Sequence, residues 1–295
     1  MHISEALKAL RPFFSFEFFP PRDEDGVEAL IETAQTLKPL RPAFVSITYG
    51  AGGSTRPRTV ELSKRIRNEV GLNVMAHVTC TGNSRADLRA VFSDLWNCGI
   101  DNVLALRGDP PKNDPAFAPA PGGLEHADEM VAMLDRNYRF CVGAACYPEK
   151  HPEAPDFATD IARLRAKVDA GAAFLITQLF FDNDAYFDFV SRARAAGITV
   201  PIIPGIMPIT NYAQIERFTA MIGATIPPKL LVELEQRNGQ AKAVEDLGVA
   251  YATLQCADLL RRGAPGIHFY TLNKSPATRA IVSSLLAATA WKASF

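Results

Sequence analysis

The sequence has few cysteines and almost no net charge, and each shortage excludes a class of protein. The five cysteines are odd in number and show no CxxC spacing, which argues against a disulfide framework and favours reduced, mostly buried thiols. Only Cys80 and Cys146 lie near predicted strand ends, where a thiol could be catalytic. The 31 basic and 32 acidic residues are well mixed, with a net charge of -1, so the chain has no basic stripe for nucleic acid.

Long hydrophobic runs are also missing. No segment reaches the length of a transmembrane helix, and MHISEALKALRPFF at the start contains no apolar stretch typical of a secretory leader. We therefore expect a soluble, cytoplasmic protein with no membrane partner. With 295 residues, 48% of them hydrophobic, the chain can bury one large core.

Polar residues recur where short apolar runs end. Examples are Glu17 in FFSFEFFPP, His77 in NVMAHVT, Asp109 after NVLALRG and Gln178 in AAFLITQ. In a (β/α)8 barrel, the catalytic groups lie at the carboxyl ends of several strands. This placement therefore predicts an enzyme with that architecture.

The spacing of the apolar runs supports the same fold. Strands are predicted over 13–19, 43–49, 73–79, 101–106, 139–145, 173–178, 199–203 and 266–272, with helices between them. The segment 224–263 adds one or two extra helices between the seventh and eighth strands. We predict a single (β/α)8 TIM-barrel domain over residues 1–295. A doubly wound sheet is the rival, but no GxGxxG motif follows the first strand.

Glu17 is the leading catalytic candidate. It lies between Phe16 and Phe18, with further phenylalanines nearby. A carboxylate among phenyl rings loses hydration, so we expect its pKa to be raised and the group to hold a proton at neutral pH, as a general acid does. The alternative is a strand residue paired with a buried arginine.

Asp109 and the histidines are weaker candidates. Asp109 follows Arg107 and Gly108 in LALRGDPP and is either a catalytic carboxylate or a turn residue paired with Arg107. His77 is more simply a buried core histidine than a metal ligand, because no HxH or HExxH motif occurs. His151 follows the fifth strand, where it could contact a ligand.

Two loops could border a site. GAGGST at 50–55 leads into a helix N-terminus, whose N–H groups could bind a phosphate, but a plain βα turn explains the motif equally well. The proline-rich loop after Asp109 is long, and long loops inside compact domains are often functional. Composition and spacing thus indicate a barrel enzyme with an acid and a polar rim, and they reveal no cofactor.

Eight segments in order along nearly the whole chain resemble the methylenetetrahydrofolate reductase family of the short bacterial type. They are FSFEFFPPR, FVSITYGAGGSTR, AHVTCTG, NVLALRGDPP, ACYPEKHPEA, ITQLFFD, IIPGIMPITNY and HFYTLNK. The resemblance implies a barrel that binds FAD non-covalently and uses NADH or NADPH to reduce 5,10-methylenetetrahydrofolate to 5-methyltetrahydrofolate, a step of one-carbon metabolism that supplies methionine. It also implies one pocket shared by nicotinamide and folate, a homo-oligomer, and no regulatory C-terminal domain.

The resemblance assigns roles by position. Glu17 matches the general acid of the family, and Asp109 matches the aspartate that meets the pterin near the flavin. Cofactor-binding positions are matched by Thr48, His77, Arg107, Gly108, Tyr147, His151, Asp160 and Lys167. Substrate-binding positions are matched by Gln178, Gln214, Phe218 and Lys274. Lys274 stands where some relatives have arginine, which keeps the charge and loses the bidentate fork.

Two other functions fit the residues alone. A metal-dependent barrel lyase or hydrolase would use Glu17, His77 and Asp109, and the purified protein would be colourless and contain metal. A non-catalytic folate-binding subunit would bind folate without oxidising nicotinamide. The sequence also leaves the choice between NADH and NADPH open.

Overall fold

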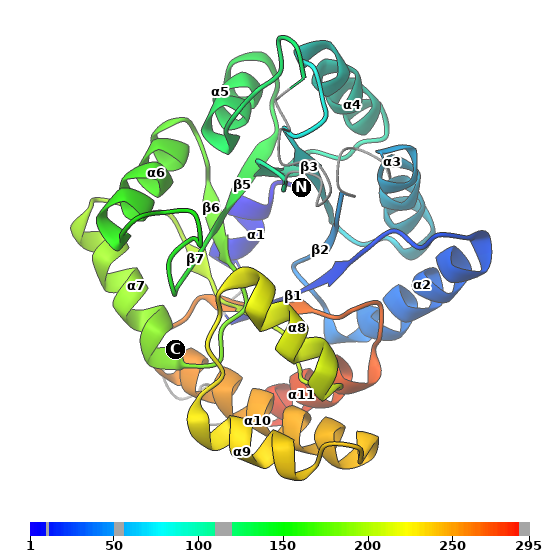
Figure 1. The fold of residues 1–295 in the computed structure, drawn as a ribbon. Coiled ribbons are helices and arrows are strands. Elements are labelled where there is room, and N and C mark those ends of the chain that lie inside the picture. Colours follow the sequence, from blue (N-terminus) through cyan, green and yellow to red (C-terminus); the bar gives the residue numbers. More distant parts are fainter. Residues whose placement is uncertain (10–11, 50–55, 110–119, 289–295) are drawn as a thin grey trace.

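The computed structural model describes residues 1–9, 12–49, 56–109 and 120–288 of the chain. Within them, a ring of helices surrounds a central ring of parallel strands (Figure 1). The strands are β1 (Phe13–Phe18), β2 (Phe44–Ile47), β3 (Val74–Thr79), β4 (Asn102–Leu106), β5 (Cys141–Cys146), β6 (Phe174–Thr177), β7 (Ile202–Ile203), β8 (Gly205–Ile206) and β9 (Gly266–Tyr270). The loops at 50–55 and 110–119, which the sequence suggested as borders of a site, lie outside the described residues.

The helices follow the strands in the predicted alternation. They are α1 (Ile3–Ala9), α2 (Glu24–Leu37), α3 (Arg56–Arg65), α4 (Arg85–Asn97), α5 (Ala127–Asn137), α6 (Phe157–Asp169), α7 (Asn183–Ala195), α8 (Tyr212–Ile222), α9 (Pro228–Gln236), α10 (Ala241–Arg261) and α11 (Pro276–Ala287). The helix expected over 55–70 is α3 followed by a π-helical turn, Ile66–Val70. Segment 224–263 forms α9 and α10, so the prediction of extra helices before the last strand is confirmed.

The barrel closes through a strand that is interrupted at Pro204. The strand order is β7-β6-β5-β4-β3-β2-β1-β9-β8, and each pairing is parallel. β7 and β8, at the two edges of this order, are separated only by Pro204, which has no N–H to donate to a neighbouring strand. Its carbonyl still accepts from the His268 N at 2.9 Å. The two short strands are thus halves of the seventh barrel strand, and the predicted (β/α)8 barrel is confirmed.

The helix α1 closes the N-terminal end of the barrel. Its Ile3, Ala6 and Leu7 are buried in the same hydrophobic cluster as Phe13. The Ile3 N donates to the Asn102 side chain at 2.8 Å, at the start of β4. This helix is not predictable from the sequence, because its seven residues are too few for a clear helical period.

The barrel interior changes from apolar to polar along its axis. Phe13 and Met75 belong to the apolar cluster at the N-terminal end. Because alternate residues of a strand face the same side, Ser15 and Glu17 follow Phe13 into the interior, and His77 follows Met75. The polar inner layer therefore lies at the carboxyl ends of the strands, where barrel enzymes place their chemistry.

Candidate active site

A cavity of about 590 Å³ opens at the carboxyl ends of the strands. Its volume is in the range of small-molecule sites. Most of the predicted site residues line it, namely Glu17, His77, Arg107, Gly108, Asp109, Tyr147, His151, Asp160, Lys167, Gln178 and Phe218. The structure therefore brings together residues at the carboxyl ends of five strands, β1, β3, β4, β5 and β6, with further residues from α6 and α8.

Three predicted site residues lie apart from this cavity. Gln214 and Lys274 line a second cavity together with Arg217. Gln214 and Phe218 are one turn apart on α8, so this helix borders both cavities. Thr48 lines neither of these two cavities, and its carbonyl accepts from the Thr59 hydroxyl at 3.1 Å.

Glu17 lies among histidines and not among phenyl rings. Phe16 and Phe18 are on the other face of β1, in the hydrophobic layer between strands and helices. The Glu17 Oε2 is 3.4 Å from the His268 Nε2 and 3.5 Å from the His77 Nε2.

This environment reverses the expected protonation of Glu17. Burial acts to raise its pKa, but the hydrogen bond with His268, the two nearby imidazoles and the Ser46 hydroxyl outweigh burial and lower the pKa. The prediction of a raised pKa is therefore wrong. Its premise fails because strand alternation turns the neighbouring phenyl rings away from the carboxyl group.

His77 is buried and available to a ligand. Burial lowers its pKa to about 4, against the opposite effect of Glu17, so the imidazole is neutral near pH 7. Within the described part of the chain, its Nε2 has no hydrogen-bond partner of good geometry. Native proteins rarely leave such an atom unsatisfied. A ligand in the cavity would supply the missing partner.

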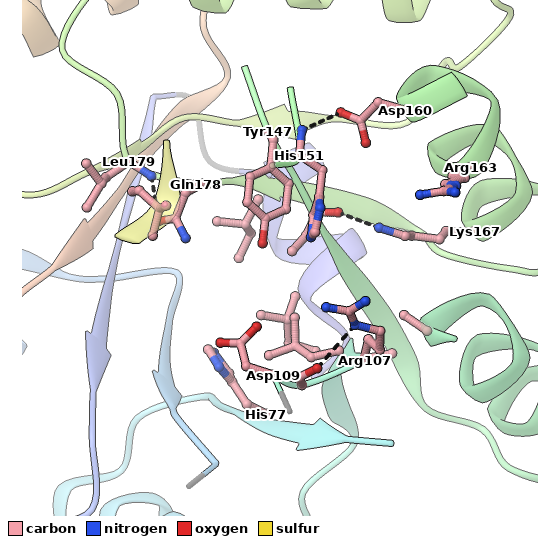
Figure 2. Close-up of a pocket in the computed structure, with 18 of the residues that line it drawn as sticks. His77, Arg107, Asp109, Tyr147, His151, Asp160, Arg163, Lys167, Gln178 and Leu179 are labelled. Carbon is pink, nitrogen blue, oxygen red and sulfur yellow. Dashed lines mark hydrogen bonds between the residues drawn. The ribbon is translucent and has the colours of Figure 1, made fainter. Parts of the chain in front are cut away.

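The Asp109 backbone depends on the glycine before it. Gly108 has φ of 84°, and a Cβ there would lie 2.9 Å from the Thr79 Cβ. Asp109 is exposed at the cavity edge, and Figure 2 shows it beside His77. The sequence left open a second role for Asp109, as a turn residue paired with Arg107. The structure does not show this pair, because the Arg107 guanidinium binds Glu153 at 2.5 and 2.7 Å.

Two cations of α6 face the cavity. Figure 2 shows Arg163 and Lys167 reaching toward it from the same helix. The Lys167 Nζ donates to the Ala145 O at 3.0 Å, and burial lowers the pKa of the amine. Sequence reasoning missed Arg163, although its spacing of four residues from Lys167 on a helix would have placed the two on one face.

The loop after β5 is fixed by contacts among predicted site residues. The Tyr147 and His151 rings meet edge to face, with centroids 4.5 Å apart. The His151 N donates to Asp160 Oδ2 at 3.1 Å, as Figure 2 shows. Asp160 therefore supports the cavity wall in addition to lining it.

Gln178 directly follows β6. Its Oε1 accepts from the Leu179 N at 2.8 Å.

Thiol chemistry has no support in this structure. Burial raises the pKa of Cys80 to about 12 and raises that of Cys146 further. The two thiols that the sequence left open as catalytic are therefore un-ionised and hidden. In the described ranges, no three His, Cys, Asp or Glu side chains converge as metal ligands would. None of the helices described above combines the length and hydrophobicity needed to cross a bilayer.

Comparison with known proteins assigns the chain to a family. Residues 2–286 match the family model of methylenetetrahydrofolate reductase. The chain is 41% identical over 283 residues to methylenetetrahydrofolate reductase (NADH) 1 of Arabidopsis thaliana, covering 92% of this chain and 48% of the plant protein. It is 39% identical over 272 residues to 5,10-methylenetetrahydrofolate reductase of Escherichia coli, covering 92% and 90%.

The matches differ in how much of each relative they cover. The chain spans about half the length of the plant relatives and nine-tenths of the bacterial one. A solved Clostridium thermocellum protein that binds two copies of 5-methyl-5,6,7,8-tetrahydrofolic acid has a TM-score of 0.62 at 16% identity, covering 95% of each chain, which shows a shared fold. The family match extends over nearly the whole barrel, from α1 to α11, and the chain belongs to the methylenetetrahydrofolate reductase family.

Proposed function

We propose that this protein reduces 5,10-methylenetetrahydrofolate to 5-methyltetrahydrofolate, with FAD as its bound cofactor and NADH or NADPH as electron donor. The proposal rests on one observation in a chain that belongs to the family. Glu17, Asp109 and most of the positions matched to flavin contacts line the same cavity. The plant relatives are named for NADH, so NADH is the donor to test first.

The residues of the cavity suit FAD. Arg107, Arg163 and Lys167 supply positive charge for the diphosphate. The His77 Nε2, which lacks a hydrogen bond of good geometry among the described residues, can bond a polar atom of the cofactor. Tyr147 and the apolar strand residues offer surfaces for the rings. When bound, FAD would carry a hydride from nicotinamide to folate.

Glu17 provides the proton that the folate half of the reaction needs. The imidazolidine ring of the substrate opens to an electrophilic iminium when one of its nitrogens is protonated. A carboxylic acid within the cavity can supply that proton. Because its pKa is lowered, protonated Glu17 is a stronger acid than an ordinary glutamic acid side chain. Only the protonated fraction can act, so the folate half-reaction should slow as pH rises.

Asp109 and Gln178 would hold the pterin. Support for this comes from their position, since both line the same cavity and carry hydrogen-bonding groups. Phe218 lines it from α8 and offers an apolar contact. One cavity then serves nicotinamide and folate in turn. Initial rates should therefore give the parallel double-reciprocal lines of a ping-pong reaction.

The test is an anaerobic experiment on the purified, FAD-supplemented protein. Bleaching of the flavin absorbance by NADH, followed by its return on addition of methylenetetrahydrofolate, is the expected result. Bound metal with no flavin would instead support a metal-dependent lyase or hydrolase. Folate binding without nicotinamide oxidation would support a non-catalytic folate-binding subunit. Either outcome would overturn the proposal.

A further inference from the structure

Ser15, His268 and Glu17 form a row of polar contacts inside the barrel. The Ser15 Oγ is 2.8 Å from the His268 Nδ1, and the His268 Nε2 is 3.4 Å from the Glu17 Oε2. The parallel pairing of β1 with β9 sets Ser15 opposite His268 and Glu17 opposite Tyr270, so strand register places the row.

The imidazole of His268 is firmly held. Ser15 and His268 are both fully buried. The Phe44 ring stacks on the imidazole with centroids 5.8 Å apart and an interplanar angle of 17°, and the Tyr270 ring meets it edge to face at 5.4 Å. A side chain packed on two sides and bonded at both nitrogens has little freedom to turn, so it can fix the carboxyl group that it contacts.

The partner of Nδ1 decides which nitrogen carries the proton. A serine hydroxyl can donate to Nδ1, and the neutral imidazole then carries its hydrogen on Nε2, toward Glu17. An N–H donor at the His268 Nε2 stabilises the ionised carboxylate that remains after Glu17 has given up its proton. Among the described residues, His77 on β3, Ser46 on β2 and Tyr270 on β9 also lie near Glu17.

We propose that His268, held by Ser15 with its proton on Nε2, is the positioning residue that orients Glu17 and strengthens it as an acid. The inference rests on the proposed function and assigns a role to two residues that neither the motifs nor the family resemblance singled out. Ser15 acts only through His268, and His268 acts only through Glu17.

Two substitutions separate the contacts. The shorter amide of His268→Asn replaces Nδ1 and can still reach Ser15, but it loses the Nε2 contact with Glu17. At a pH low enough to protonate Glu17, we expect it to slow the folate half-reaction about 10–100-fold, because the acid is no longer oriented. Ser15→Ala keeps the contact with Glu17 but frees the tautomer, so its effect should be smaller.

The pH profile distinguishes positioning from simple damage. In His268→Asn, the decline of the folate half-reaction with rising pH should begin at a higher pH than in the wild type, because the carboxyl group has lost a donor that favours its ionised form. In Ser15→Ala the shift should be smaller, because part of the imidazole still carries its proton on Nε2. Flavin bleaching by NADH, which needs no proton from Glu17, should keep its wild-type rate in the same samples.

The tautomer is measurable in ligand-free protein. The chain has five histidines, and ¹⁵N-histidine labelling with His268→Asn as the assignment reference identifies the His268 signals. We expect a protonated Nε2 and an unprotonated Nδ1 in the wild type, and a mixture of tautomers in Ser15→Ala. A protonated Nδ1 in the wild-type protein would refute the proposal.

A buried polar residue at the other end of the barrel serves as the control. Asn102→Ala removes the side chain that binds the Ile3 N, and it should lower thermal stability while leaving both half-reactions and their pH profiles unchanged. If the wild type reduces methylenetetrahydrofolate but His268→Asn matches it at every pH, the positioning role is wrong and the proposed function stands. If the wild type neither bleaches nor turns over, the proposed function itself fails.

Discussion

The side chain of Asn273 forms two hydrogen bonds with the backbone of Phe19, from the Phe19 N to Oδ1 at 2.9 Å and from Nδ2 to the Phe19 O at 2.8 Å. Beside it, the Thr271 hydroxyl donates to the Glu17 O at 2.6 Å. These contacts join the end of β9 to the end of β1. The backbone that carries Glu17 is therefore positioned from the far end of the sequence.

Replacing Asn273 should loosen this junction. Asn273→Ala removes both hydrogen bonds and places alanine at φ of 59°, a conformation that asparagine tolerates better. We expect the free energy of unfolding in urea to fall by about 1–3 kcal/mol. Asn273→Gly keeps the backbone conformation accessible and should lose less. Equal losses in the two variants would show that backbone strain contributes nothing.

Glu17→Gln should separate the two half-reactions. Glutamine keeps the size and polarity of the side chain but cannot donate the proton. Flavin bleaching by nicotinamide should proceed at nearly the wild-type rate, and reoxidation by methylenetetrahydrofolate should slow by roughly 10²–10⁴-fold. Stopped-flow absorbance times each step. Equal slowing of both would indicate a structural role, and no slowing of either would show that the proton comes from another group.

Asp109→Asn should weaken folate binding. The carboxylate is exposed at the cavity edge, where it can accept a charge-assisted hydrogen bond from a pterin N–H. Loss of such a bond costs about 1.5–3 kcal/mol, or roughly 10–100-fold in Kd. A carboxylate near the flavin also disfavours negative charge on its reduced form, so the reduction potential should change. Unchanged affinity and potential would remove Asp109 from the site.

Lys167→Met should weaken FAD binding. The side chain reaches the cavity from α6, and its substitution removes a cation while keeping apolar bulk. We expect the Kd for FAD, measured by fluorescence, to rise about 10-fold or more, as for loss of a hydrogen bond to a charged group. Arg165→Met, on the outer face of the same helix and paired with Asp169, is the matched control. A similar Kd in both variants would exclude Lys167 from the cofactor site.

His77 should make the fold sensitive to acid. Its pKa is about 4 in the folded protein and about 6.5 when unfolded, so the unfolded chain binds the proton more readily. Stability from this group is fully present above pH 6.5 and is lost as pH falls toward 4, by up to about 3 kcal/mol. His77→Gln should flatten the urea stability profile over that interval, whereas His2→Gln, outside the cavity, should not. An unchanged slope in His77→Gln would contradict the depressed pKa.

The strand ends were predictable from the sequence because each apolar run stops at a polar residue. Glu17, His77 and Gln178 could be placed at one end of a barrel for that reason, and the structure confirms that they share a cavity. The resemblance added Asp160 and Lys167, whose roles no spacing could reveal.

The surroundings of Glu17 were not predictable in the same way. The residues next to Glu17 in the sequence are phenylalanines, which suggested an apolar environment. Its neighbours in space are His77 of β3 and His268 of β9, and these could be identified only from the register of the closed sheet. Arg163 was overlooked because a cation on an amphipathic helix is ordinarily solvated. Gln214 and Lys274 were expected at the same site, and the structure places them at a second cavity behind α8.

The helix α1 has a consequence for the order in which this barrel assembles. Ile3 and its partner Asn102 are separated by 99 positions, and the Ser4 N faces the Cys141 Sγ across 137. Contacts of such separation carry a large loop-closure entropy and form slowly. The helix also needs β4 and β5 to be paired before its binding surface exists. We therefore expect α1 to close the N-terminal end of the barrel late in folding, although it precedes every strand in the chain.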